Sequence, residues 1–387
     1  MKTNLIAFIL VVLGACATPK NESEDNIFIN LDGSVAGKTS DIVDSFDYLL
    51  IDYSEDFPIV QPYRILFYEN LIFIEDNTQN HIFIIDQNGK VLNVIKSQGN
   101  GPRQFSYIDD FQVEKNKILI KDTLLDKFIA FDFQGNFLYE EKASNKAIDF
   151  YAAKDFKLHF FSNRLNQGEF NLVKENIEGK IIEQNYPPKE GYAGRKIFSL
   201  EQDFIEDKTK KQIVLKIPFS YDIAFFDLNG DLQKIKTFDF GPYNLSDSDR
   251  LFFSNGRFDD APEDEYSNLV EYINQFFAVG NKYYMFLTKG RKESHLILLD
   301  RGLNPQNQYL KIENDLDGLP IINFPRWQRE GQLVQRLSST TFLNNYLRNE
   351  DLLKSKFPEA KIHDFVEKNR YKLERDWLVL IFWNLKE

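Results

Sequence analysis

The sequence predicts an all-β fold, a six-bladed β-propeller with a helical insertion before the last strand. Three observations support this: a unit of strands and turns recurs along the chain, residues that favour strands are abundant, and the two ends of the chain can complete a final unit. The 387 residues include 36 Phe and 18 Tyr, and 43% of all residues are hydrophobic. Such a chain can bury a sizeable core, and its composition suits pleated strands.

The clearest repeat lies in the first half of the chain. Residues 69–92 and 115–138 align without gaps at an offset of 46 residues, so that Asp86 matches Asp132. Each copy holds two apolar runs, an aspartate, a glycine turn and a third apolar run, which predicts three strands of a meander. We interpret both aspartates as caps of backbone N–H groups in the turns. The alternative, a catalytic or metal-binding role, is disfavoured because the aspartate recurs with the turn.

Weaker copies of this turn follow at Gly179, Gly230 and Gly302. The five copies therefore predict five blades. A sixth blade can be assembled from the two termini, with residues 377–383 next to residues 27–30 and 48–51. Units of about 40–50 residues are typical of propellers. Joining the first and last segments in one blade closes the ring and leaves only short sheet edges.

Residues 326–372 break the strand pattern. Leu333, Val334 and Leu337 fall near helical spacing, and later apolar residues do the same. The pattern predicts a helical insertion packed on one face of the propeller. We therefore assign residues 27–387 to one propeller domain that contains this insertion.

The N-terminus has the layout of an export signal. Residues 1–4 are polar and include Lys2, residues 5–13 are apolar, and small residues precede Cys16. The apolar run is far shorter than the roughly 20 residues that span a bilayer as a helix. We interpret residues 1–15 as a signal peptide and residues 16–26 as a flexible tether.

Residues 13–16, Leu-Gly-Ala-Cys, resemble the lipobox of bacterial lipoproteins. This resemblance implies that Cys16 is lipidated and that the mature protein is anchored to a membrane of the cell envelope, with the outer membrane favoured. The alternative is an ordinary signal peptide with an incidental cysteine.

Acidic residues at 22–25 resemble the surface-export signals of Bacteroidetes lipoproteins, although a solvated tether is the interpretation we favour.

Residues 96–113 carry a second resemblance. Gly99, Gly101, Pro102 and Phe105 match a segment that marks the Bacteroidetes six-bladed β-propeller lipoproteins, which are similar to NHL-repeat propellers. Gln104 stands where that family usually has Glu. The resemblance implies a fold and an envelope location, but no activity. The residues themselves favour a structural role over ligand contact: the glycines permit a tight crossing, the proline stiffens it and the phenylalanine packs beneath it.

Charge and composition exclude several functions. The net charge is −12, which disfavours a nucleic-acid partner. A single cysteine precludes an intramolecular disulfide and a zinc site made of several thiolates. The histidines, none of which has a metal-binding spacing, are His81, His159, His295 and His363. We assign no catalytic residue, and a protein that is not an enzyme is favoured.

Two functional hypotheses remain. The first is a binding or scaffold propeller that recognises a peptide, a glycan or a protein partner on the face where loops and inner-strand ends converge. The second is a hydrolase or lactonase that uses a cation such as Ca²⁺ in the central channel. The first is favoured and needs no cofactor. Acidic residues predicted near the starts of the inner strands are Asp109, Asp110, Asp149, Asp203 and Asp222. Their convergence on the axis would favour the second hypothesis.

Overall fold

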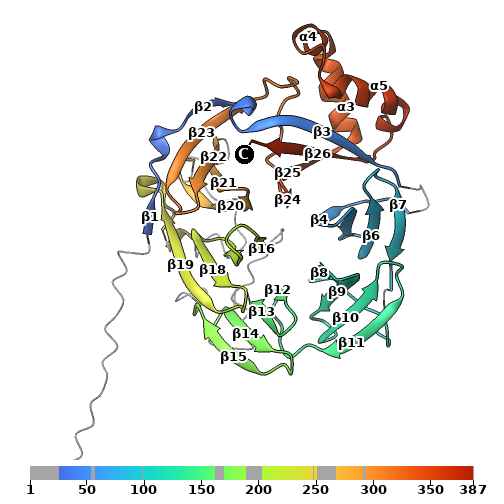
Figure 1. The fold of residues 1–387 in the computed structure, drawn as a ribbon, viewed down its shortest axis with the longest axis vertical. Coiled ribbons are helices and arrows are strands. Elements are labelled where there is room, and N and C mark those ends of the chain that lie inside the picture. Colours follow the sequence, from blue (N-terminus) through green and yellow to red (C-terminus); the bar gives the residue numbers. More distant parts are fainter. Residues whose placement is uncertain are drawn as a thin grey trace, which may run out of the picture.

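A computed structural model describes residues 26–53, 57–97, 99–161, 170–188, 203–246, 248–250, 267–290 and 293–386. In these residues six sheets stand around a central axis (Figure 1). The predicted six-bladed β-propeller is therefore confirmed. We number the blades I to VI in the order in which their innermost strands occur in the chain.

Blades I to III each contain four antiparallel strands, which follow one another from the axis outward. Blade I consists of β4 (Pro62–Tyr68), β5 (Leu71–Asp76), β6 (His81–Asp86) and β7 (Val91–Ile95). Blade II consists of β8 (Asp110–Glu114), β9 (Lys117–Asp122), β10 (Lys127–Asp132) and β11 (Phe137–Lys142). Blade III consists of β12 (Asp149–Ala152), β13 (Phe156–Phe160), β14 (Leu172–Asn176) and β15 (Ile181–Asn185).

Blades IV to VI include strands from the N-terminal part of the chain. Blade IV consists of β16 (Phe204–Asp207), β17 (Gln212–Lys216), β18 (Asp222–Asp227), β19 (Leu232–Asp239) and β1 (Asn26–Phe28). Blade V consists of β20 (Val270–Val279), β21 (Lys282–Lys289), β22 (Glu293–Asp300), β23 (Pro305–Glu313) and β2 (Val35–Lys38). Blade VI consists of β24 (Trp327–Arg329), β25 (Gln332–Ser338), β26 (Leu378–Leu385) and β3 (Val43–Ile51).

The N-terminal segment runs along the outer rim of three successive blades (Figure 1). It pairs in parallel with β19 through β1 and with β23 through β2, and short 3₁₀ turns at Leu31–Gly33 and Thr39–Asp41 connect these strands to β3. The sequence prediction that residues 27–30 belong to the closing blade is therefore wrong. Ile29 and Leu31 are instead buried in the apolar core that blades IV and V share, so their hydrophobicity serves this packing.

The two ends of the chain meet in blade VI, as predicted for residues 48–51 and 377–383. Strand β26 lies between β25 and β3, and Trp383 is the cross-strand partner of Phe46. Their rings lie 5.6 Å apart at 86° in an edge-to-face contact, and Trp383 is fully buried. The ring is thus closed by two strands more than 300 residues apart in the sequence.

Helices α3 (Ser339–Arg348), α4 (Glu350–Lys356) and α5 (Lys361–Leu373) form the insertion between β25 and β26. They lie outside the ring next to β3 (Figure 1). The prediction that this insertion begins at residue 326 is wrong, because Leu333, Val334 and Leu337 lie in β25. Leu333 pairs with Trp383 and Leu337 with Val379, so these side chains pack in a sheet, and a short apolar run fits either period.

The recurring turn between the third and fourth strands follows one design. Oδ1 of Asp86 accepts hydrogen bonds from the N–H groups of Asn88 and Lys90, both at 2.9 Å. The same pair of bonds, to residues two and four positions on, recurs at Asp132, Asn176, Asp227 and Asp300. The predicted capping role of the aspartates is thus confirmed. In the last of these turns Leu303, not Gly302, takes the positive φ of 70°.

Candidate functional site

A cavity of about 1490 Å³ lies on the axis of the ring, and we call it the central channel. The innermost strands of all six blades line it: β4, β8, β12, β16, β20 and β24. Its inner end is formed where three of these strands begin, at Asp110, Asp149 and Asp203. Its mouth is formed by the turns that follow the innermost strands, which include Glu69, Lys115, Lys154, Lys208, Gly280 and Glu330.

The propeller repeat places the three inner-end aspartates together. Asp110 is the first residue of β8, Asp149 is the first residue of β12, and Asp203 directly precedes β16. Successive blades repeat the same orientation around the axis, so residues at one position of the repeat gather at one end of the channel. All three are buried, with exposed fractions of 6%, 3% and 2%.

Arg64, in β4, connects the inner-end carboxylates. Its Nη1 lies 2.9 Å from Oδ1 of Asp110 and 3.6 Å from Oε2 of Glu75, and its Nη2 lies 3.5 Å from Oδ1 of Asp149. Burial opposes the charge of Arg64, but Asp110, Glu75 and Asp149 outweigh it and raise its pKa above the ordinary value. One guanidinium therefore joins blades I, II and III around the axis.

The carboxylates around Arg64 are hard to ionise. Burial raises the pKa of Glu75 to about 8 and that of Asp110 to about 6, and Arg64 offsets part of both effects. Burial also raises the pKa of Asp149 well above its ordinary value, and the neighbouring Asp203 and Asp110 add to this effect. The cations at the inner end therefore do not fully offset the cost of ionising these buried acidic groups.

Asp149 and Asp203 differ from Asp110 in their hydrogen bonding. Asp110 uses both oxygens, since Oδ1 faces Arg64 and Oδ2 accepts from the N–H of Phe150 at 2.9 Å. Oδ1 of Asp203 lies 3.0 Å from Nζ of Lys216. Oδ2 of Asp149 and Oδ2 of Asp203 are buried and have no hydrogen-bond partner. A buried polar atom without a partner carries a free-energy cost, so these two oxygens are candidate ligand contacts.

A second buried polar cluster joins blades II and III behind the channel lining. Nζ of Lys121 lies 2.9 Å from Oδ1 of Asn145 and 3.4 Å from Nδ1 of His159, whose Nε2 lies 2.9 Å from Oε2 of Glu175. Burial lowers the pKa of His159 to about 4, and the nearby Lys121 contributes. Burial also lowers the pKa of Lys121 to about 7. These contacts explain His159 as part of an inter-blade network.

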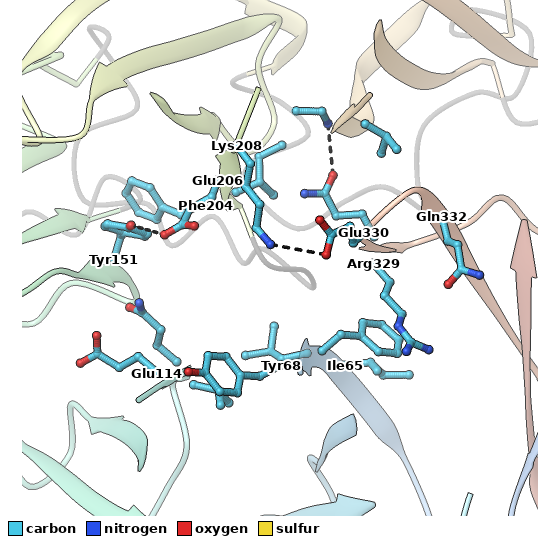
Figure 2. A pocket seen from close by; sticks show the side chains of 18 of the residues that line it. Ile65, Tyr68, Glu114, Tyr151, Phe204, Glu206, Lys208, Arg329, Glu330 and Gln332 are labelled. Carbon is cyan, nitrogen blue, oxygen red and sulfur yellow. Dashed lines mark hydrogen bonds and ion pairs between the residues drawn. The ribbon is translucent and has the colours of Figure 1, made fainter. Parts of the chain in front are cut away.

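Charged and aromatic side chains surround the mouth (Figure 2). The hydroxyl of Tyr151 donates to Oε1 of Glu206 at 2.5 Å, and Lys208 lies 3.9 Å from Glu330 on another blade. Burial and Glu206 raise the pKa of Tyr151 above its ordinary value, so this tyrosine remains a neutral donor. Lys208 and Glu330 are 73% and 86% exposed in their side chains, and such a pair contributes little to stability. Both charges are therefore accessible to a ligand.

Of the five acidic residues predicted near the starts of the inner strands, the structure brings three to the channel. Asp109 instead accepts from the N–H of Thr123 at 2.7 Å. Asp222 lies in the third strand of blade IV and accepts from the hydroxyls of Tyr186 and Thr237, both at 2.6 Å.

Sequence reasoning missed Arg64 and Glu75. The signal that could have found them is a charged residue inside an apolar strand, as in Tyr-Arg-Ile-Leu-Phe.

Within the described ranges, no group of three or more His, Cys, Asp or Glu side chains is arranged to hold a metal ion. Arg64 lies within 3.5 Å of both Asp110 and Asp149, so a positive charge already occupies their vicinity. The cation-dependent hydrolase remains an untested hypothesis.

The glycine-rich segment lies apart from the channel lining. The N–H of Gly99 donates to the carbonyl of Phe105 at 2.9 Å, and Gly99 has a φ of 143°. Oε1 of Gln104 accepts from the N–H of Gly101 at 3.0 Å, a contact that a glutamate could also make. Phe105 is fully buried against Phe131, while Pro102 is exposed. These contacts accord with the structural role that remains the prediction for this segment.

The signal peptide, Cys16 and most of the tether lie outside the described residues. Within the part of the chain that the structure describes, no helix is long and apolar enough to cross a membrane.

Comparison with known proteins supports the fold. Residues 18–335 match the model of the family DUF5128, described as a 6-bladed beta-propeller. A Bacteroides fragilis protein classed as exported is similar in structure, with a TM-score of 0.71 at 17% identity over 94% of this chain and 99% of that one. A member of the DUF4221 family from Bacteroides vulgatus gives a TM-score of 0.49 at 12% identity, over 89% and 97%. No curated protein matches significantly.

Proposed function

This chain belongs to the DUF5128 family of six-bladed β-propellers, and we propose that it is an exported, lipid-anchored protein that binds a peptide segment in its central channel. The observation that carries the proposal is the channel itself: about 1490 Å³, lined by six blades, with accessible charges at its mouth and buried carboxylates at its inner end. This volume exceeds the roughly 300–1,000 Å³ of typical small-molecule pockets, which favours a segment of a polymer.

The lining favours a peptide over a glycan. Lysines, an arginine and glutamates all line the mouth, and the rings of Tyr68, Tyr151 and Phe204 lie near them (Figure 2). Peptides carry both charges together with apolar groups, so they can use all three kinds of contact. An uncharged glycan could stack on the aromatic rings but would add no positive charge to the carboxylates at the inner end beyond that of Arg64 and Lys216. A glycan ligand is the competing outcome of the test.

The envelope location rests on the sequence and on one relative. Cys16 follows a short apolar run and small residues, the layout of a lipidated export signal. The similar Bacteroides fragilis structure is classed as exported. A lipid on Cys16 followed by a polar tether would hold the propeller at the surface of a membrane, with the outer membrane favoured.

The test uses the purified mature protein and a random dodecapeptide library, with a glycan array in parallel. Ala153 and Ala278 line the channel, so the double substitution A153W/A278W narrows it. The control is K180W, because Lys180 is exposed at a turn of blade III outside the channel lining. We expect selected peptides to lose at least tenfold in affinity with the double variant and to keep it with K180W. Equal binding to both variants, or binding of glycans alone, would contradict the proposal.

A further inference from the structure

We propose that the inner end of the channel recognises a positively charged amine of the bound peptide, with Asp149 and Asp203 as its acceptors. This inference rests on the proposed function and specifies the ligand group that reaches deepest. Both residues line the channel, from adjacent blades, and both are more than nine-tenths buried. In each residue Oδ2 has neither a hydrogen-bond partner nor a cation at ion-pair distance.

Acidic groups outnumber cations at the inner end. Four buried carboxylates gather there: Glu75, Asp110, Asp149 and Asp203. In the described part of the chain, two cations lie within ion-pair distance of them, Arg64 and Lys216. The nearby Lys121 directs its ammonium to Asn145 and His159 in the inter-blade cluster. A ligand that brings one positive charge would reduce the excess of acidic groups.

The geometry suits an ammonium better than a metal ion. Ca²⁺ takes six to eight oxygen ligands. At the inner end, Oδ2 of Asp149 and Oδ2 of Asp203 have neither a hydrogen-bond partner nor a cation at ion-pair distance, and the guanidinium of Arg64 lies beside Asp149. An ammonium group carries three donors and needs only a few acceptors. Two carboxylates from neighbouring blades can accept two of its hydrogen bonds, and charge-assisted bonds of this kind are the strong ones.

The wall above the two aspartates suits the alkyl stem of a lysine. Tyr151 lies two residues after Asp149 in β12, on the same face of the strand. Phe204, which follows Asp203, is 3% exposed and packs in the core between blades III and IV. The two rings lie 6.3 Å apart and both line the channel (Figure 2). Lysine side chains bury their methylene groups on apolar surfaces while the ammonium reaches a polar partner. The partly exposed ring of Tyr151 thus offers an apolar surface on the way to the two acceptors.

The experiment compares two forms of one random dodecapeptide library, with free amines or with every amine acetylated, since acetylation removes the charge. Each form is selected on the wild-type protein, on D203N and on the control D155N. Asn at 203 keeps an acceptor for Lys216, and Asp155 is an exposed carboxylate of the same region outside the channel lining. Folding of each variant is checked by circular dichroism. D149N is the second test variant.

We expect the wild type and D155N to enrich basic peptides from the free library, with affinities about tenfold or more above those of their acetylated forms. With D203N and D149N this preference should disappear. Equal enrichment from both libraries would overturn the amine site while leaving peptide binding intact, whereas enrichment from neither library would overturn both. Displacement of the peptides by CaCl₂ alone would assign the carboxylates to a metal and also overturn the amine site.

Discussion

The guanidinium of Arg64 lies 2.9 Å from the carboxylate of Asp110, and this pair joins blade I to blade II with both side chains almost inaccessible to water. Buried pairs of this kind need additional hydrogen bonds to offset their desolvation. Arg64 also donates to the carbonyl of Asp109 at 3.3 Å, and Asp110 accepts from the N–H of Phe150 in blade III. The pair therefore belongs to a network that fixes three blades around the axis.

Removing the cation from this network should destabilise the ring strongly. We expect R64M to lower the free energy of unfolding by about 3–5 kcal/mol, because carboxylates then remain buried without their partner. The measurement is urea unfolding followed by tryptophan fluorescence. R348M, at an exposed position of α3, should change it by less than about 0.5 kcal/mol. If R64M and D110N were simply additive in the double variant, the two residues would not act as a coupled pair.

His159 should destabilise the folded protein in mild acid, while the raised pKa values of Glu75 and Asp110 act in the opposite direction. Its pKa is about 4 in the folded protein, below the ordinary value of 6.5. As the pH falls from 6.5 towards 4, His159 takes up a proton in the unfolded chain but not in the folded protein. The free energy of unfolding that His159 contributes therefore decreases in that window. At pH 5 the contribution of His159 should be a loss of about 2 kcal/mol relative to pH 7, seen as the difference between the wild type and H159Q.

The check is unfolding of the wild type and of H159Q at both pH values. H159Q should lack this part of the pH dependence, since glutamine can still hydrogen-bond to Glu175 but does not titrate. An unchanged pH dependence in H159Q would show that other groups cause the loss.

Two glycines at equivalent turns should differ in their tolerance of alanine. Gly179 and Gly230 have similar positive φ values, 76° and 78°. A Cβ at Gly230 would lie 2.4 Å from Cε2 of Phe156, whereas at Gly179 its nearest neighbour is the Cβ of Ser144 at 3.8 Å. G179A should therefore cost about 1–2 kcal/mol for backbone strain alone. G230A should cost about 1–3 kcal/mol more, since the buried ring of Phe156 must move.

Thermal unfolding of the two variants measures this difference directly. The glycines serve as matched controls for each other, because the turn geometry is shared. Equal losses of stability would mean that Phe156 adapts without cost.

Substitution of Cys16 should separate export from anchoring. We expect C16S to abolish incorporation of a labelled fatty acid and to release the protein from the membrane fraction, because the sulfur carries the lipid in lipoproteins with this layout of residues 13–16. The propeller itself should fold as before, since it begins at residue 26. The measurement is metabolic labelling together with fractionation of envelope membranes. Labelling that persists in C16S would contradict the lipidation.

The repeat allowed the fold to be predicted because the same local chemistry recurs. Asp86, Asp132 and Asp227 cap equivalent turns, and the register of apolar residues follows from those turns. The path of the N-terminal segment could not be predicted. Its strand β1, of three residues, is too short to show a strand period. Its pairing with β19 and the packing of Ile29 and Leu31 against blades IV and V determine where it lies.

The candidate site was predictable in part. Asp110, Asp149 and Asp203 stand out at the starts of inner strands, but their convergence depends on the closed ring. Arg64 contacts carboxylates 46 and 85 positions later in the chain, and no local pattern identifies such partners. Which carboxylate oxygens remain without a partner depends on the packing of three blades, and sequence spacing does not contain that information.

Strands β1 and β2 are the outermost strands of blades IV and V. Their position has a mechanical consequence if force acts on the N-terminal tether. Such force would act first on the parallel pairing of β1 with β19 and then on that of β2 with β23. It would reach the strand pair β3–β26, which closes the ring, only after both had separated. Force along a paired strand must break several hydrogen bonds together. In the proposed lipid-anchored protein, the two outer strands would therefore detach first and protect the β3–β26 pair from force applied at the membrane.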